Sequence, residues 1–120
     1  MTKIMDKDGF EWSIKFFYVK NPEENPLAQV RTYCSMRKTV DESVTTKVEY
    51  CDCSKKDKYD KRLGMKLAFQ RCIKKITDDK NERLILWKEF FKHINDPHRT
   101  QFFNYYYGID DSVEDNLVTA

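Results

Sequence analysis

The stretch from Cys53 to Ile76 constrains the fold more than any other part of the chain, because a strand pattern ends within it and a helix pattern begins. When each residue is advanced by about 100°, the apolar side chains fall on one arc of a helix. The members of that arc are Met65, Ala68, Phe69, Cys72, Ile73 and Ile76. Arg71, Lys74 and Lys75 lie outside it. The pattern predicts an amphipathic helix over 57–76 that packs one stripe against another layer.

The start of this helix also has a recognisable signal. Ser54 suits the cap, with Asp57 three residues later, and acids in a first turn favour the positive end of the helix dipole. Leu63 and Leu67 fall opposite the main apolar arc, so we expect them to need a separate partner.

The composition indicates one folded domain. The 120 residues include 8 Phe, 7 Tyr and 2 Trp against 3 Gly and 3 Pro, a bias opposite to that of disordered chains. Charged residues make up 35%, but a net charge of +2 gives no strong attraction to nucleic acid or membrane. The N-terminus lacks the apolar run of a signal peptide, so we expect a cytoplasmic protein. We assign 1–109 to a single α+β domain and 110–120 to an acidic, frayed tail.

Alternating apolar and polar residues predict strands ahead of the helix. A short strand over 2–5 leads into a turn at 6–9, where Gly9 supplies the positive φ of a tight hairpin. One face of the next strand carries Phe10, Trp12, Ile14, Phe16 and Tyr18. Phe17 and Val19 make the far end of that strand apolar on both faces, so we expect a helix or an interface contact to cover it.

Two further strands follow a loop at 21–26 that contains both prolines of the first half of the chain. The strand over 28–37 has one face formed by Ala28, Val30, Thr32, Cys34 and Met36. After a turn at 41–43, one side carries Val44, Thr46, Val48 and Tyr50, and the other carries Thr45, Lys47, Glu49 and Cys51. Short turns between these strands predict an antiparallel meander.

A second helix is expected to complete the fold. Asp79 and Glu82 have the spacing of a capping box, and a helical stripe follows at Leu84, Trp87, Phe91 and Ile94. The residues 95–97 end this helix, and the period of the run 101–107 does not decide between strand and short helix. We therefore predict the α+β class, with an antiparallel β-meander of three to five strands covered by two C-terminal α-helices.

The four cysteines are interpreted as small packing residues in a reducing compartment. Cys51 and Cys53 share a face if both lie on a strand, but structural zinc needs four ligands, and His93 and His98 are far away in the sequence. We predict no metal site. His93 suits the negative end of the second helix, where an imidazolium would be favourable. A phosphate contact at His98 and Arg99 is an open alternative.

The sequence contains none of the motifs that usually indicate catalysis, such as a glycine-rich phosphate loop, a nucleophile elbow or a metalloprotease helix. Asp57 and Asp60 form a pair of carboxylates, but acids are common at helix starts for electrostatic reasons. We expect no enzymatic activity and no cofactor.

Basic residues around the start of the first helix are one candidate binding site. They are Lys55, Lys56, Lys58, Lys61, Arg62 and Lys66. Helix starts offer N–H groups to anions, and a meander followed by a lysine-rich helix start is similar in topology to the double-stranded-RNA-binding domain. The helix that precedes the sheet in that domain is absent here, and Asp57 and Asp60 dilute the charge. A solvated charged face is the alternative interpretation.

Candidate binding residues also lie near the C-terminus, at Arg99, Phe103, Tyr105 and Tyr107. Aromatic residues in such a run serve in protein interfaces, in base stacking or in a core. Trp12 or Tyr105 beside Arg99 would form a platform for a nucleotide messenger.

The segment 46–94 resembles a type of small protein that is frequent in bacteriophages and prophages. The likeness consists of a strand ending in Cys, a D-x-Y-D-x-x-x-G-x-x-x-A helix start and an aromatic-rich second helix. The matching residues are Cys53, Asp57, Tyr59, Asp60, Gly64, Ala68, Trp87, Phe90 and Phe91. In physical terms, we expect Gly64 to let the helix approach the sheet closely and Tyr59 to pack under the helix start.

This resemblance and the lack of a catalytic motif lead to one main hypothesis. We expect a non-enzymatic, phage-type accessory protein in the host cytoplasm that binds and modulates or inhibits a host protein, for example in counter-defence. Homo-oligomers through the same aromatics are a related expectation. Nucleic-acid binding by the basic segment is the first alternative and a nucleotide-messenger sponge is the second. No membrane partner is expected.

Overall fold

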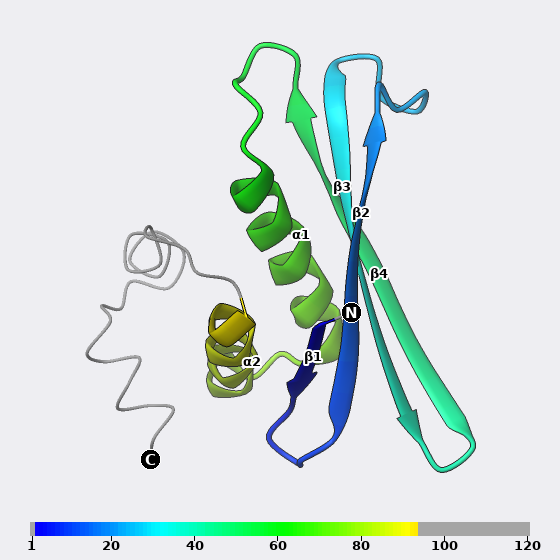
Figure 1. Cartoon of the computed structure of the whole chain (residues 1–120), viewed down its shortest axis with the longest axis vertical. Helices are drawn as coiled ribbons and strands as arrows, with labels where there is room; N and C mark the ends of the chain where they lie inside the picture. Colours follow the sequence, from blue (N-terminus) through cyan, green and yellow to red (C-terminus); the bar gives the residue numbers. More distant parts are fainter. Residues whose placement is uncertain (1, 94–120) are drawn as a thin grey trace.

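Strands and helices occupy separate halves of the chain in the computed structural model, which describes residues 2–93 (Figure 1). The strands are β1 (Thr2–Met5), β2 (Glu11–Lys20), β3 (Ala28–Val40) and β4 (Ser43–Ser54), and the helices are α1 (Lys61–Ile76) and α2 (Lys80–His93). Neighbouring strands pair antiparallel in the order β1-β2-β3-β4. The predicted α+β class, a meander followed by two helices, is confirmed.

The first hairpin is held by one carboxylate. Asp6 accepts N–H bonds from Asp8 at 2.9 Å and Phe10 at 3.0 Å, and its second oxygen accepts from the Trp12 indole at 3.1 Å. Gly9 has a φ of +81°, as expected from the sequence. The turn therefore aligns β1 with β2 and points the Trp12 ring into the core.

Both helices cover the same face of the sheet. α1 packs on β3 and β4, while α2 lies beside β1 (Figure 1). Phe69 of α1 stacks on Phe90 of α2 with ring centroids 4.5 Å apart and meets Trp87 edge-on at 4.8 Å. Around these rings the buried core includes Trp12, Ile14, Cys34, Met36, Cys72, Ile73, Leu84 and Leu86. Burial of this apolar surface is the main term that holds the two layers together.

The start of α1 differs from the prediction. The helix begins at Lys61 rather than at 57, and its N-cap is Asp60, whose carboxylate accepts the Leu63 N–H at 3.1 Å. The predicted cap at Ser54 is wrong because strand pairing continues to that residue, opposite Ala28.

The predicted capping box of α2 is present only in part. Asp79 accepts the N–H groups of Asn81 at 2.8 Å and Glu82 at 3.2 Å. The Glu82 carboxylate instead accepts the hydroxyl of Thr77 and pairs with the Lys7 ammonium at 2.8 Å. Glu82 therefore ties the start of α2 to the β1–β2 turn.

The apolar arc of α1 is confirmed at its centre, where Ala68, Phe69, Cys72 and Ile73 are buried. Leu67, expected opposite that arc, packs against the core instead. Leu67 is only partly buried, so it lies at the flank of the interface between α1 and the sheet.

Gly64 lies where α1 packs tightly against β3. A Cβ added at this glycine would lie 2.8 Å from the Thr32 hydroxyl oxygen of β3, well inside van der Waals contact. Thr32 is β-branched and almost fully buried, so it has little freedom to move. The expected role of Gly64 in close packing is confirmed.

We predict that Gly64→Ala destabilises the protein although alanine favours helix. The overlap with Thr32 costs about 1–3 kcal/mol, which exceeds the gain of about 1 kcal/mol in helix propensity. In a Thr32→Ala background the overlap disappears, so the same Gly64→Ala change should be neutral or stabilising. Urea unfolding of the four proteins measures this coupling, and equal effects of Gly64→Ala in both backgrounds would contradict it.

Candidate functional site

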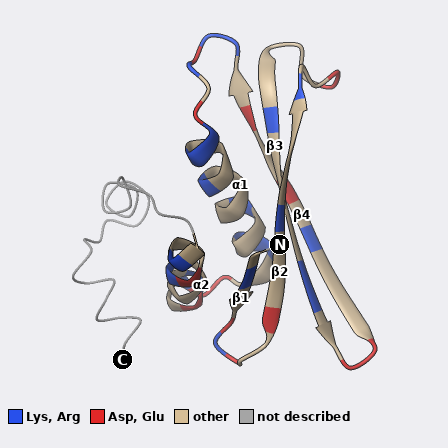
Figure 2. Ribbon diagram, in the orientation of Figure 1, with Lys and Arg blue, Asp and Glu red and all other residues tan. Residues whose placement is uncertain are grey.

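Five of the six basic residues predicted as a binding site lie together at one end of the molecule, whereas Lys66 is buried and does not belong to this exposed group. Lys55, Lys56 and Lys58 are in the loop before α1, and Lys61 and Arg62 are in its first turn (Figure 2). All five side chains are exposed. Within residues 2–93, none of them lies within ion-pair distance of a carboxylate. This end of the protein therefore offers cations to an anionic ligand.

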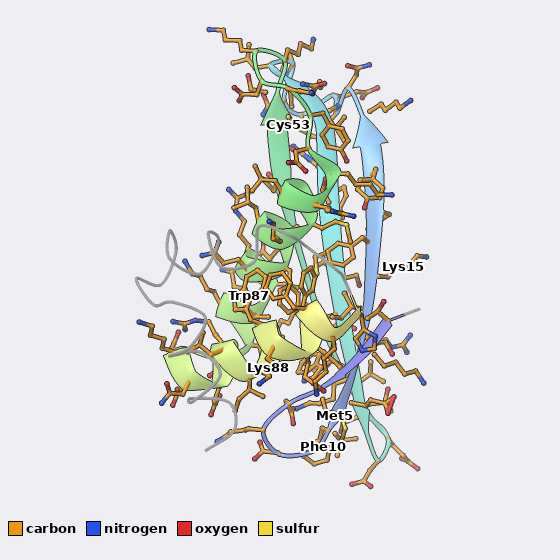
Figure 3. All side chains as sticks on the ribbon, turned by 60° about the vertical axis from the view of Figure 1, so that its left-hand side comes forward. Met5, Phe10, Lys15, Cys53, Trp87 and Lys88 are labelled. Atoms are coloured by element: carbon orange, nitrogen blue, oxygen red, sulfur yellow. The ribbon has the colours of Figure 1, made fainter. Side chains whose placement is uncertain are left out.

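A small cavity lies beneath these residues, between the start of α1 and the end of β4. Its volume is about 190 Å³, and Thr32, Cys51, Cys53, Tyr59, Gly64 and Leu67 are among the residues that line it. Tyr59 is half-buried there, as expected. Cys53 is labelled near this end of β4 in Figure 3.

Three of the four cysteines, Cys34, Cys51 and Cys72, are buried, and Cys53 is half-buried. Burial raises the pKa of the Cys51 thiol, so it stays neutral at physiological pH. Cys34 and Cys72 are fully buried, and the Cys72 thiol lies 3.2 Å from the carbonyl oxygen of Lys47. In the part of the chain from 2 to 93, no three His, Cys, Asp or Glu side chains gather as metal ligands would.

One candidate for nucleotide binding is wrong. Trp12 was expected as a stacking platform, but only 2% of it is exposed, and its indole N–H is held by Asp6. A buried ring in the core cannot receive a base. The other predicted residues, Arg99, Phe103, Tyr105 and Tyr107, lie outside the described residues, as do His98 and the 110–120 tail.

The face of the sheet opposite the helices carries a row of aromatic side chains that is not among the predicted binding residues. Phe17, Tyr33 and Tyr50 occupy directly paired positions on β2, β3 and β4. The rings of Phe17 and Tyr33 are stacked at 4.7 Å with 12° between their planes, and Tyr33 lies 5.7 Å from Tyr50. We call these three residues the aromatic row and this side of the sheet the open face.

Arg31 fixes the aromatic row in place. Its Nε donates to Asp52 Oδ1 at 2.7 Å and a terminal nitrogen donates to Oδ2 at 3.1 Å. The guanidinium carbon lies 3.9 Å from the centroid of the Tyr50 ring, and Nη1 is 3.5 Å from the Tyr33 hydroxyl. Arg31 is 5% exposed, and its bidentate bonds hold the pKa of the Asp52 carboxyl below the usual value.

The geometry of the row decides which ligands suit it. Phe17 and Tyr33 cover one another's faces, and Arg31 covers a face of Tyr50. A base-stacking platform needs open ring faces, and here stacking within the row and the Arg31 guanidinium occupy one face of each ring. The arrangement therefore suits contact with another protein better than contact with bases.

A shallow hollow lies next to the row on the same face. Its volume is about 590 Å³, and its lining consists of Glu11, Ser13, Lys15, Ser35, Arg37 and Thr39. The two serines are short, which explains the depression. Glu11 is paired with Lys3 at 3.4 Å, whereas Lys15 and Arg37 have no ion-pair partner within residues 2–93.

Exposed aliphatic residues extend the open face along β4. Val44 and Val48 are each about half exposed, and Tyr50 follows them on the same side of the strand. The pattern of β4 indicated that these residues share a face but left open which face the helices cover. The open face therefore consists of three parts: the aromatic row, the hollow, and an aliphatic strip along β4 formed by Val44 and Val48.

Comparison with family models, curated proteins and solved structures gives no match to this chain. The argument for a function therefore depends on the residues described above. None of the helices formed by residues 2–93 is both long and apolar enough to cross a membrane.

We predict that the Arg31–Asp52 pair makes stability depend on acid pH. The folded-state pKa of Asp52 lies below its unfolded value of about 3.9, so the contribution is fully present above that pH. This contribution to stability is lost as the pH falls through the lower pKa that Asp52 has in the folded state. Asp52→Asn should therefore lose stability at pH 7, and its deficit relative to the parent should shrink below about pH 4.

Thermal unfolding between pH 2 and pH 7 measures this difference, with Asp78→Asn as the control for loss of one exposed carboxylate. A deficit of Asp52→Asn that stays constant down to the lowest pH would contradict the assignment.

Proposed function

We propose that this protein is a non-enzymatic binding protein whose ligand is another protein, and that the open face of the sheet makes the contact. The observation that carries the proposal is the aromatic row, which is fixed by Arg31 but exposed: 39% of Phe17 and 40% of Tyr50 face solvent. Large rings that are held rigid before binding lose little entropy on binding.

The side chains of the open face indicate which kind of surface the partner presents to it. The exposed side chains along the row and β4 favour an apolar contact surface, with acceptors for the Tyr33 and Tyr50 hydroxyl groups. Lys15 and Arg37, which flank the hollow, favour a carboxylate on the partner. The partner surface thus combines an apolar centre with an acidic group that enters the hollow.

The biological setting of the proposal is a bacterial host cell. The segment 46–94 resembles a type of small phage and prophage protein, and a protein of that type gains by binding and inhibiting a host protein. The partner is then a host enzyme or a component of a defence system, and the action takes place in the host cytoplasm.

We predict that variants of the open face lose the partner. Tyr33→Ala and Tyr50→Ala should each weaken binding by about tenfold or more, because truncated interface tyrosines commonly cost over 1 kcal/mol. The tagged parent, each variant and the control Lys55→Glu/Lys56→Glu/Lys58→Glu are used to capture proteins from the native host. A partner retained by the parent and the control is then purified and titrated by calorimetry.

Circular dichroism confirms that each variant is folded before its affinity is compared. A purified partner that binds Tyr33→Ala and Tyr50→Ala as tightly as it binds the parent would place the contact elsewhere and contradict the use of the open face.

A second candidate function is nucleic-acid binding by the exposed cations at the start of α1. Asp57 and Asp60 lie among those cations, and the net charge is only +2, so we rank this function lower. If it applies, log affinity falls with log salt by about 0.7–0.9 for each phosphate contact.

We predict no tight binding of DNA or RNA at about 150 mM salt, because the contacted phosphates would meet the two carboxylates as well. Gel-shift titration of the parent and of Lys55→Glu/Lys56→Glu/Lys58→Glu tests this. A sub-micromolar affinity that disappears in the triple variant would reverse the order of the two proposals.

A further inference from the structure

The strand β2 continues beyond its neighbour β1. The pairing of β1 with β2 runs from Met5 opposite Glu11 to Thr2 opposite Ile14. From Lys15 to Lys20, β2 is paired only with β3, and no described element lies along its other side (Figures 1 and 3). We call this side of residues 16–20 the free edge.

Two backbone hydrogen bonds show which groups point to the free edge. The Asn21 N–H donates to the Gln29 carbonyl across the β2–β3 hairpin at 2.9 Å, and the Asp6 N–H donates to the Phe10 carbonyl across the β1–β2 hairpin at 2.9 Å. Hydrogen-bonded pairs alternate along an antiparallel ladder. The backbone groups of residues 17 and 19 therefore face β3, and those of 16, 18 and 20 face outward.

The outward groups have no hydrogen-bond partner within residues 2–93. They comprise the N–H and C=O of Phe16, Tyr18 and Lys20. The side chains of this stretch, Phe-Phe-Tyr-Val, favour strands strongly. A strand edge that has no partner among residues 2–93 is a template for another strand.

We infer that the free edge of β2 receives an extended segment of the partner protein as an added strand, with an apolar centre and carboxylates near both ends. This inference rests on the proposed function and adds the mode of contact. Five residues of β2 span about 17 Å, which is enough for three pairs of main-chain hydrogen bonds on alternate residues.

Charge decides between a partner segment and a second copy of this chain. Lys15 and Lys20 stand at the two ends of the free edge, are exposed, and have no ion-pair partner within residues 2–93. Their side chains alternate with the strand, so Lys15 lies on the open face and Lys20 on the helix side. Pairing two β2 edges would bring only lysines to both ends and no carboxylate, whereas an added strand with acidic ends is attracted at both, so charge favours the partner segment.

The side chains around the free edge favour an added strand that is apolar on both faces. On the helix side, Phe16 meets the Phe90 ring edge-on at 6.1 Å, and the Lys61 ammonium lies 5.2 Å from the Tyr18 ring. On the open face, Phe17 continues into the aromatic row and Val19 is exposed. An added strand would therefore enlarge the open face, so one partner can use both surfaces.

The test uses amide hydrogen exchange read by NMR on the full chain. In the free protein we expect the amides of 17 and 19 to exchange slowly and those of 16, 18 and 20 to exchange fast. Decapeptides are selected from a displayed random library against the immobilised protein, and the best binders are synthesised. Binding of these peptides should slow exchange at 16, 18 and 20 by at least tenfold.

Three changes should abolish that protection. Methylation of alternate peptide nitrogens removes the main-chain donors. Lys15→Glu with Lys20→Glu repels the acidic ends, and should weaken binding at least tenfold. Tyr18→Pro removes one outward N–H without breaking the β3 ladder, and Tyr18→Val, which keeps that N–H, is the matched control.

The outcomes separate this inference from the proposed function. Selected peptides that protect 16, 18 and 20 and that fail to bind after N-methylation support the added strand, even if Tyr18→Pro does not fold. Peptides or a captured partner that bind without protecting these amides, but are lost in Tyr33→Ala, overturn the inference and leave the open-face proposal in place. Protection that rises with protein concentration alone, with a dimer in sedimentation, overturns it in favour of a second copy. Selection that yields no binder, together with no protection by a captured partner, also overturns it.

Discussion

The contact between the two helices determines which surfaces of this protein remain available. Phe69 stacks on Phe90 and meets Trp87 edge-on, so α1 and α2 share one aromatic cluster on one side of the sheet. Gly64 lets α1 lie close to Thr32 of β3, which draws the whole helical layer onto that side. Because both helices pack on that side, no element in residues 2–93 covers the opposite face of the sheet. The open face is therefore a consequence of how the core is built.

Much of the fold follows from local patterns in the sequence. The alternation around Trp12 and Ile14, the helical arc around Phe69 and the turn at Gly9 all predict the elements that are observed. The N-cap of α1 is harder to predict from the sequence, because Ser54 and Asp60 both have suitable side chains. Strand pairing of Ser54 with Ala28 decides the question, and that pairing is a non-local contact. Leu67 is misjudged for the same reason, since its partial burial comes from the interface between α1 and the sheet.

The candidate binding residues also differ in how far the sequence alone predicts their positions. The basic residues before α1 are neighbours in the sequence, so their proximity is predictable from the sequence alone. Phe17, Tyr33 and Tyr50 are far apart in the sequence and meet only because two hairpin registers place them in one row. Arg31 and Asp52 form a bidentate pair one row further along. The signal was present in the alternation of β3 and β4, but the sequence did not say which of the two faces is covered.

An exposed apolar face beside an unpaired strand edge carries a risk of aggregation, and the distribution of charge limits that risk. Lys15 and Lys20 border the Phe-Phe-Tyr-Val stretch, and Lys at strand edges is a common protection against uncontrolled pairing. Arg31 acts within the face itself, where it covers one side of the Tyr50 ring and is neutralised by Asp52. The same charges that disfavour pairing with another copy of the chain select an acidic partner. Protection from self-association and choice of ligand are thus two results of one arrangement of charge.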